Sequence, residues 1–551
     1  MGVRACAALS LVLTSGMAIA APPPIVETTA GPVQGVDTPD GPRWFGVPFG
    51  VPPLGDLRWR PTVPATSWDA WPERLDDEGV LQADALGSAC LQPWEDGPYG
   101  SEDCLYLNVF APPDAQGAPV FVHIHGGANF WGWGEDDATG FTRHGVVVVT
   151  MNYRLGMMGL LAHPALTDEG GGTSSNYHAW DQIAALRWVR DNIAAFGGDP
   201  DNVTLGGFSA GAGNTLALVA SPEAAGLFAR ATVLAVGDAW VTGTNMHSLA
   251  LREWIGERIA ARLGCADDVA DVPACLRALP AERIMDEWGG DDWGPTVDGV
   301  ILPRPAIDQI VVNGGTVPLI IGFNREETAS FIMGDVPDPL SWNEYVIGSN
   351  DLKPAKLATA ARKLFTESAY GSLRWAFLMM TVASVHGCPT RRVALATRNT
   401  TYRYLHTHVL ENYAWAQEAR AYHGAEYDLL WWADTMDLTD EERALSETLR
   451  RYWTNFMWSG DPNGEGLVTW PEYEPASERI LVTDTTMSEV SAYHARECAI
   501  LDQAPVYPTC NTAWCRKFMS QVLGTPGWWA DWGWFPDETR QPPPPRPPRD
   551  R

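Results

Sequence analysis

The chain has 551 residues, of which 45% are hydrophobic and 19% are charged, a composition typical of a globular protein that buries a large core. Its formal net charge of −30 argues against nucleic acid as a partner, because phosphate backbones attract basic surfaces. Beyond the N-terminus no segment offers eighteen uninterrupted apolar residues, so we expect no stable membrane insertion of the mature protein.

Residues 1–20 differ from the rest and predict a cleaved secretory signal. Arg4 precedes a mostly apolar run from Ala5 to Leu13, and Ala18-Ile19-Ala20 stands before Ala21 and three prolines. A retained membrane anchor is the alternative, but the apolar run is short and no charged stop-transfer sequence follows it. We therefore expect a secreted protein, or a periplasmic one if the source is bacterial.

The cysteines are consistent with export. Nine cysteines become eight once Cys6 leaves with the signal, and an even number in an exported chain suggests four disulfides. Sequence alone does not fix their pairing. Three pairs would each close a small loop and a fourth would span a long separation: Cys90 with Cys104, Cys265 with Cys275, Cys510 with Cys515, and Cys388 with Cys498. A zinc site is the rival interpretation, but the chain contains no CxxC pair.

Alternating strands and helices are predicted through the middle of the chain. Residues 120–124 and 146–150 are apolar or β-branched, as is typical of strands buried on both faces of a parallel sheet. A helix follows, with apolar residues at three- and four-residue steps from Ile183 to Phe196, and Gly197-Gly198 ends it. Further strands are predicted at 231–236, 319–321 and 402–409. This alternation predicts an α/β fold whose mostly parallel central sheet has helices on both faces.

No linker divides the chain before about Pro505, so residues 21–505 are predicted to form one α/β domain. Residues 506–551 form a different extension, which contains several tryptophans: Trp514, Trp528, Trp529, Trp532 and Trp534. A hydrophobic clasp on the domain is our first interpretation of them, and a carbohydrate or polymer contact is the second. The proline-rich end from Gln541 is expected to be disordered.

The pattern G-x-S-x-G occurs at Gly207-Phe208-Ser209-Ala210-Gly211, between an apolar run at 203–205 and a predicted helix at 210–220. This is the setting of a nucleophile elbow, where a serine sits in a strained turn and small neighbours let strand and helix approach. Alone the pattern is weak, because chance supplies it about 0.2 times in a chain of this composition. An incidental serine in a glycine-rich turn is the alternative, so other parts of a mechanism are needed.

A serine nucleophile also needs donors that hold the developing oxyanion. The predicted strand at 120–124 ends in His125-Gly126-Gly127-Ala128, a turn whose small residues let backbone N–H groups face a ligand. Gly127, Ala128 and Ala210 are therefore the candidate donors. His123 and His125 share a strand face and could be metal ligands, but no third ligand stands out. We expect His125 to brace the turn through hydrogen bonds, and we predict no metal and no cofactor.

An acid and a base follow later in the chain. The strand at 319–321 runs into Gly322-Phe323-Asn324-Arg325-Glu326-Glu327, which places carboxylates just past a strand end, where α/β folds carry their chemistry. Taken alone, these residues are better explained as a solvated acidic loop. His423 lies in a loop beside a glycine and can approach the serine, whereas His406 and His408 fall within a predicted strand. The order serine, acid, histidine is that of α/β-hydrolases.

Several stretches together resemble the type-B carboxylesterase and cholinesterase family, over roughly residues 31–501. They are Gly46-Val47-Pro48-Phe49 with Pro52-Pro53, Ser101-Glu102-Asp103-Cys104-Leu105-Tyr106-Leu107-Asn108, Asn152-Tyr153-Arg154-Leu155-Gly156, Phe196-Gly197-Gly198-Asp199-Pro200, Val297-Asp298-Gly299 and the segment from Trp453 to Asn463. The resemblance implies an α/β-hydrolase fold and hydrolysis of carboxylic esters.

The resemblance also implies a role for each site residue. Ser209 would be the nucleophile, His423 the general base and acid, and Glu327 the orienting carboxylate, with Glu326 at the neighbouring acidic position. The oxyanion donors fall on Gly127, Ala128 and Ala210. The likeness supports three of the disulfides, Cys90 with Cys104, Cys265 with Cys275, and Cys388 with Cys498, and leaves Cys510 with Cys515 as an inference from the remaining cysteines.

The chain departs from the family pattern at three places, and Trp94 is a further position for comparison. Phe208 stands where the family usually has glutamate, so the negative charge beside the serine is missing and the case for cationic choline esters is weaker. Trp94 stands where cholinesterases keep an aromatic that meets a quaternary ammonium, although a lone tryptophan is more often packing. Ala128 replaces the third glycine of the oxyanion turn without removing a donor. Gly237-Asp238-Ala239 replaces the serine that follows the next sheet strand.

The sequence therefore predicts a secreted serine carboxylesterase that cleaves small or medium neutral esters through an acyl-enzyme, with water as the second nucleophile. A non-catalytic adhesion protein of the same fold is the rival from another class, but serine, glutamate and histidine are all present. A lipase or polyester hydrolase is a second rival, for which the aromatic tail could be a surface contact. The natural ester, the oligomeric state and the use of the Asn202 and Asn399 glycosylation sequons stay open.

Overall fold

The computed structural model describes residues 25–94, 97–237, 248–266, 269–287, 293–315 and 317–504. The predicted signal (1–20), the C-terminal extension (506–551) and the Cys510 and Cys515 pair lie outside these residues. Within the described part of the chain, no helix has the length and apolar character that a membrane crossing requires.

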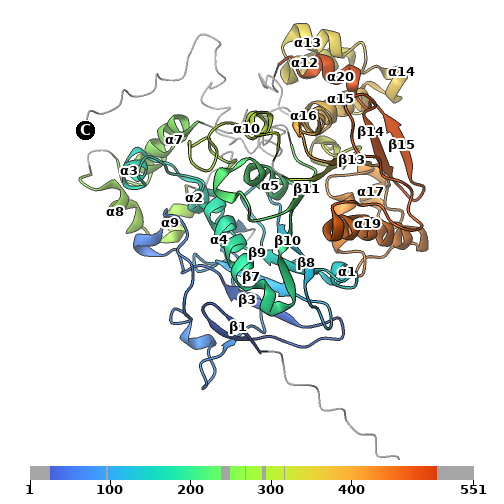
Figure 1. The fold of residues 1–551 in the computed structure, drawn as a ribbon. Helices are drawn as coiled ribbons and strands as arrows, with labels where there is room; N and C mark the ends of the chain where they lie inside the picture. Colours follow the sequence, from blue (N-terminus) through green and yellow to red (C-terminus); the bar gives the residue numbers. More distant parts are fainter. Residues whose placement is uncertain are drawn as a thin grey trace, which may run out of the picture.

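A ten-stranded sheet forms the centre of the molecule (Figure 1). In spatial order its strands are β15 (Ser488–Ser491), β14 (Arg479–Thr483), β13 (Thr401–His406), β12 (Leu319–Asn324), β11 (Arg230–Leu234), β10 (Gly198–Phe208), β8 (Ala118–Ile124), β9 (Val147–Met151), β7 (Tyr106–Phe110) and β3 (Arg43–Pro48). The strands from β14 to β9 are parallel, and antiparallel pairs occur at both edges. The predicted mostly parallel sheet is confirmed.

Helices cover both faces of this sheet because its central strands are apolar on both sides. In β8, Val120, Val122 and Ile124 belong to the larger hydrophobic core, whereas Phe121 belongs to a second core. Helices α4 (Tyr177–Asn192) and α5 (Ala210–Ala220) pack in the larger core, and α19 (Asp440–Ser459) packs in the second. Figure 1 shows α4 and α19 on either side of the strands.

The boundaries of two predicted elements differ from the sequence-based expectation. The helix that begins at Tyr177 changes to a 3-10 turn at Ile193–Phe196 and ends at Gly197, whose φ of 84° suits glycine. Strand β13 ends at His406, so His408 lies in the loop that follows rather than in the strand. The other strands are confirmed close to their expected positions.

The remaining described elements surround this framework. Two small sheets are built from β1 (Ile25–Thr28), β2 (Gly31–Gln34) and β4 (Leu81–Gln82), and from β5 (Gln92–Trp94) and β6 (Gly97–Tyr99). The other helices are α1 (Thr139–Thr142), α2 (Gly156–Leu160), α3 (Pro164–Glu169), α7 (Leu249–Arg262), α8 (Val272–Arg277), α9 (Ala281–Met285), α10 (Ala306–Asn313), α11 (Ala329–Ile332), α12 (Trp342–Leu352), α13 (Ala355–Ala361), α14 (Glu367–Tyr370), α15 (Leu373–Val382), α16 (Cys388–Ala396), α17 (Ala414–Ala419), α18 (Ala425–Trp431) and α20 (Ala495–Leu501).

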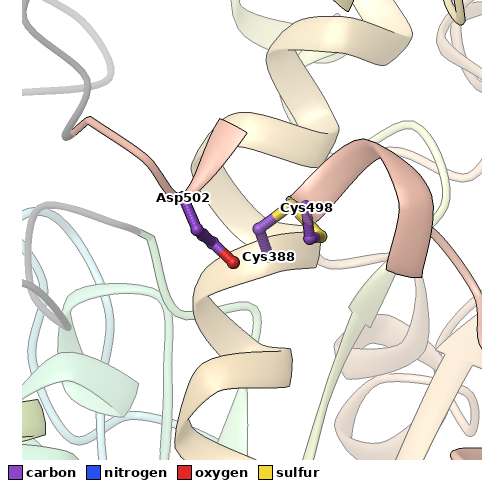
Figure 2. Close-up of side chains that lie close together, drawn as sticks. All are labelled: Cys388, Cys498 and Asp502. Carbon is purple, nitrogen blue, oxygen red and sulfur yellow. A yellow bond between two sulfur atoms is a disulfide. The ribbon is translucent and has the colours of Figure 1, made fainter. Parts of the chain in front are cut away.

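Three of the predicted disulfides are present: Cys90 with Cys104, Cys265 with Cys275, and Cys388 with Cys498. The last joins α16 to α20, as Figure 2 shows, with Asp502 nearby. These three side chains place possible metal ligands within 4.8 Å of one another. Because the two sulfurs are bonded to each other they are not thiolates, and the Asp502 carboxylate pairs with Arg392 at 3.2 Å. This group is a structural cross-link.

Candidate active site

The predicted site residues gather at one edge of the sheet. Strands β8, β10, β12 and β13 are parallel, so their carboxyl ends lie on the same side. Beyond these ends come, in order, the turn Gly126-Gly127-Ala128, Ser209, the loop with Glu327 and the segment with His423. The topology therefore brings together residues that are far apart in the sequence.

The serine occupies a strained turn between β10 and α5. Ser209 has φ 57° and ψ −119°, a conformation that costs energy for any residue with a Cβ. A Cβ on Gly207 would lie 2.2 Å from the carbonyl oxygen of Gly211, and one on Gly211 would lie 2.0 Å from the carbonyl oxygen of Ile124. Both glycines are required by close backbone approach, as a nucleophile elbow demands.

The glycine-rich turn after β8 lies directly against this elbow. A Cβ built on Gly126 would be 3.2 Å from the Cβ of Ser209. Gly127 has φ 96°, and its carbonyl oxygen accepts hydrogen bonds from the N–H groups of Phe130 (2.8 Å) and Trp131 (3.0 Å). Ala128 keeps a positive φ of 55° in spite of its side chain. The turn is thus fixed beside Ser209, and Ala210 is the first residue of α5.

The two histidines of β8 and its turn have structural contacts. The Nδ1 of His125 lies 2.8 Å from the Gly126 carbonyl oxygen, and its ring stacks on Tyr153 with centroids 4.3 Å apart. The Tyr153 hydroxyl donates to the His125 carbonyl oxygen at 2.9 Å. Burial lowers the pKa of His125 to about 4 and that of His123 to about 3, so both rings are neutral at pH 7. His125 braces the turn, as predicted.

His423 and Glu327 form a close pair. The Nδ1 of His423 lies 2.5 Å from Oε2 of Glu327, which is fully buried. The other carboxylate oxygen, Oε1, accepts hydrogen bonds from the backbone N (2.7 Å) and the Nδ2 (2.8 Å) of Asn324. Burial raises the pKa of Glu327 to about 7, against the effect of these N–H donors, and burial lowers the pKa of His423 to about 4. The carboxylate fixes the orientation of the imidazole, and burial favours its neutral form.

A second buried carboxyl, which the sequence analysis did not assign, adjoins this pair. Glu426 accepts a hydrogen bond from Nδ2 of Asn324 and another from the Tyr404 hydroxyl at 2.9 Å. Burial and the charge of Glu327 raise the pKa of Glu426 to about 7. Because Glu327 and Glu426 share one amide, a negative charge on either carboxyl disfavours ionisation of the other. The signal in the sequence was a glutamate three residues after the loop histidine.

Glu326 has a different task from its neighbour Glu327. It pairs with Arg325 at 2.7 Å and accepts a hydrogen bond from the N–H of Ala421 at 3.2 Å. Its own backbone N–H donates to the Ala421 carbonyl oxygen at 3.0 Å. These bonds hold the segment two residues before His423, so Glu326 supports the histidine loop instead of contacting the imidazole.

The match to known proteins agrees with this geometry. The profile described as the Carboxylesterase family matches residues 22–501. This chain belongs to the carboxylesterase family. It is 31% identical to carboxylesterase 1C of Rattus norvegicus, over 84% of this chain and 90% of that protein, and 32% identical to para-nitrobenzyl esterase of Bacillus subtilis, over 84% and 95%. A solved structure of PNB esterase superposes on this chain with a TM-score of 0.73 at 30% sequence identity. The match covers 87% of this chain and 99% of the PNB esterase chain.

The α/β-hydrolase fold and the carboxylesterase activity predicted from the sequence are therefore confirmed. A third relative, fumonisin B1 esterase of Sphingopyxis macrogoltabida, is 36% identical over 55% of this chain and 56% of that protein. Its name, like that of para-nitrobenzyl esterase, describes an enzyme that cleaves esters of a small molecule.

The carboxylesterase has aromatic rings around its candidate base. The ring of Phe208 lies 4.7 Å from that of His423 and 4.5 Å from that of Tyr427, and the ring of Phe331 lies 4.9 Å from His423. Trp94 is 48% exposed and contacts Tyr99 and Trp133 in a surface aromatic cluster. Asp238 and Ala239, predicted to alter the surroundings of the site, lie outside the described residues.

Proposed function

We propose that this carboxylesterase is an exported serine hydrolase that cleaves small to medium neutral carboxylic esters through an acyl-enzyme on Ser209. The observation that carries the proposal is the 2.5 Å contact between His423 and Glu327 at the sheet edge where the strained Ser209 lies. This is the set of residues that activates a serine hydroxyl: a neutral base, a carboxylate that orients it and a strained nucleophile turn.

In the first half of the reaction, the Ser209 hydroxyl loses its proton to Nε2 of His423 as Oγ bonds to the ester carbonyl carbon. The carbonyl electron pair moves to oxygen, and backbone N–H groups of Gly127, Ala128 and Ala210 stabilise that negative charge. When the tetrahedral intermediate collapses, the carbon–oxygen bond to the alcohol breaks. His423 then gives its proton to the departing alcohol, leaving an acyl group on Ser209.

In the second half, His423 takes a proton from water, and the resulting hydroxide adds to the acyl carbon. The new tetrahedral intermediate collapses and the bond to Oγ of Ser209 breaks, with the proton returning from His423 to the serine. Glu327 remains hydrogen-bonded to Nδ1 throughout and stabilises the imidazolium in both halves. The products are a carboxylic acid and an alcohol.

The preference for neutral esters follows from the residue beside the nucleophile. Phe208 presents an uncharged side chain directly before the nucleophile, and burial and the charge of Glu327 disfavour ionisation of Glu426. The third acidic residue nearby, Glu326, is paired with Arg325. The described acidic side chains close to His423 thus favour at most one charge that His423 itself contacts, and they give little attraction to a quaternary ammonium group.

Export is part of the proposal because of two observations. The N-terminus has the pattern of a cleaved signal, and three disulfides cross-link the described part of the chain. Fractionation of a culture that expresses the full chain would test it, with N-terminal sequencing of the exported product. Retention of the uncleaved chain inside the cell would contradict this part.

The mechanism is tested with Ser209→Ala. We expect hydrolysis of a p-nitrophenyl acyl ester to fall by about 10³-fold or more, to the residual rate that oxyanion stabilisation and binding alone provide. A matched control is Ser368→Ala, which removes an exposed serine on α14 and leaves turnover unchanged. Mass spectrometry of quenched wild-type enzyme should find the acyl group on the peptide that contains Ser209. Unchanged turnover of Ser209→Ala, or an acyl group on another residue, would refute the mechanism.

A further inference from the structure

The ring of Phe208 connects the catalytic histidine to a buried polar group that the mechanism does not use. The Phe208 ring lies 4.7 Å from His423 at an interplanar angle of 33°, and stacks on Tyr427 at 4.5 Å and 20°. A Cβ built on Gly424 would lie 3.0 Å from Cζ of Phe208, so the ring packs against the backbone next to His423. The Phe208 ring thus contacts the His423 ring, and Phe208 is the residue directly before Ser209 in the chain.

The far side of Tyr427 is fixed by a buried hydrogen bond. Its hydroxyl donates to Oδ1 of Asp136 and lies 3.3 Å from Nε2 of His123. All three residues are buried, with exposed fractions of 9% for Tyr427, 5% for Asp136 and 2% for His123. Burial raises the pKa of Asp136 to about 7, which shows how little solvent reaches this carboxyl. Because Tyr427 is held both by the stacking of its ring and by the hydrogen bond of its hydroxyl, its ring has little freedom to tilt. The Phe208 ring that stacks on it is restricted in the same way.

His423 needs such support at one stage of the reaction. It must hold a positive charge after it takes the Ser209 proton, although its side chain is only 12% exposed and burial disfavours the cation. Glu327 neutralises that charge from the Nδ1 side. The glutamate that the family usually has before the nucleophile is replaced here by Phe208, whose ring face carries partial negative charge and attracts cations within about 6 Å.

We propose that Phe208 is a positioning residue for His423, that its ring stabilises the imidazolium by a cation–π interaction, and that the Tyr427–Asp136 hydrogen bond holds this ring in place. The inference rests on the proposed function, because it requires His423 to become protonated during turnover. It assigns to an aromatic side chain the electrostatic task that a carboxylate beside the serine could perform.

Fluorination of the Phe208 ring tests the electrostatic part of this proposal. Mono-, di- and trifluorophenylalanine keep the shape of the ring while they weaken its negative face stepwise. With a neutral p-nitrophenyl ester we expect kcat to fall with each fluorine, by about 2- to 30-fold over the series, the range that cation–π energies correspond to, while KM changes less than about twofold. A structural role would not give this gradation. A kcat independent of fluorination overturns the proposal.

The pH dependence gives a second measurement on the same enzymes. Among the described residues, the charged or titratable groups that face His423 include Glu327, Glu426 and His386, and fluorination leaves them in place. If the Phe208 ring stabilises the imidazolium, reducing the negative charge on its face makes His423 harder to protonate in the resting enzyme as well. The acid limb of kcat/KM should therefore move to lower pH as fluorines are added. A limb that stays where it is, or moves to higher pH, contradicts the inference.

The anchoring bond is tested with Tyr427→Phe, which keeps the ring but removes the donor to Asp136, and with Asp136→Asn, which keeps an acceptor. We expect Tyr427→Phe to lower kcat about 2- to 5-fold with KM unchanged, and Asp136→Asn to stay closer to wild type. Equal kcat in wild type, Tyr427→Phe and Asp136→Asn, with melting temperatures that show that each enzyme is folded, overturns the anchoring role. Ser209→Ala, assayed in parallel, separates the two levels: if it is active the proposed function fails, and if it is inactive while fluorination has no effect, only this inference fails.

Discussion

Of the histidines that contact carboxylates in the described part of the chain, His423 and His408 differ most clearly in how their ring nitrogens are used. His423 meets Glu327 through Nδ1 at 2.5 Å. His408, in the loop after β13, meets Asp484 through Nδ1 and Glu442 through Nε2, both at 3.1 Å. The His423 imidazole contacts a carboxylate through Nδ1, whereas the His408 imidazole contacts carboxylates through both ring nitrogens.

The pKa values of the two rings move in opposite directions as a result. Burial lowers the pKa of His423 to about 4. Burial alone would lower the pKa of His408 as well, but its hydrogen bonds to Asp484 and Glu442 outweigh that effect and raise it above the ordinary 6.5. Carboxylates at both nitrogens thus favour the protonated form of His408, whereas burial favours the neutral form of His423, which is the form that can accept a proton.

Exchanging each histidine for glutamine gives the sharpest form of this comparison. His423→Gln should lower kcat for a p-nitrophenyl ester by about 10⁴-fold or more, because no base remains for Ser209. His408→Gln should stay within about twofold of wild type at pH 7, because that ring takes no part in the chemistry. Steady-state kinetics of both variants checks the contrast, and a comparable loss in His408→Gln would remove the distinction.

The pH dependence of the rate tests whether His423 acts as the base in its neutral form. The base must be neutral, and burial lowers its pKa from the ordinary 6.5, so activity is present above the folded pKa and is lost as the pH falls through it. We expect kcat/KM to be level near neutral pH and to decline as the pH falls through about 4. Rates measured between about pH 3 and about pH 8 on a neutral ester check this, and a rate that is flat down to about pH 3 would exclude His423 as the base.

The pH dependence of stability tests the His408 side. The pKa of His408 is higher in the folded protein than in the unfolded chain. Its contribution to the free energy of unfolding is therefore fully present below the unfolded pKa and is lost as the pH rises through the folded pKa. After allowance for screening at Asp484, which is 36% exposed, we expect a contribution on the order of 1 kcal/mol. The free energy of unfolding of wild type and of His408→Gln, measured with denaturant, should therefore differ more at pH 5.5 than at pH 9. An equal difference at both values would show that the charge contributes nothing.

The smallest effect concerns the substrate's charge. Because Phe208 carries no charge beside Ser209 and its ring already packs against His423 and Tyr427, acetylcholine should be hydrolysed no faster than a neutral ester of equal size, within about threefold in kcat/KM. Side-by-side assays of acetylcholine and 3,3-dimethylbutyl acetate measure this. A tenfold preference for the cationic ester would place an attractive charge near the site and refute the argument from Phe208.

Much of the framework could be read from the sequence because its signals are local. The elbow at Ser209 needs glycine at 207 and 211 for backbone clearance, and β8 and β9 need apolar side chains on both faces, so composition alone marks them. The boundary of β13 was less predictable. His406 and His408 alternate as strand residues do, yet β13 ends at the first of them and the second turns to Asp484 and Glu442.

The rest of the site depends on contacts between segments that no local pattern joins. The amide of Asn324 links Glu327 to Glu426, which is 102 residues away from the asparagine. Asp136 and Tyr427 are 291 residues apart and meet only because α18 packs over β8. Side chains of these types usually face solvent, so their sequence gives no reason to place them in the interior. Their roles follow from tertiary packing.

The close contact of Gly424 with Phe208 has a consequence for how this enzyme can be varied. Gly424 has a positive φ of 95°, and a side chain there would also meet the Phe208 ring. A larger ring at position 208 would push on the backbone that carries His423, whereas a smaller residue would leave a gap beneath it. Libraries that alter substrate range at position 208 should therefore vary the residues around Gly424 together with it, since changes at either place alone displace the base.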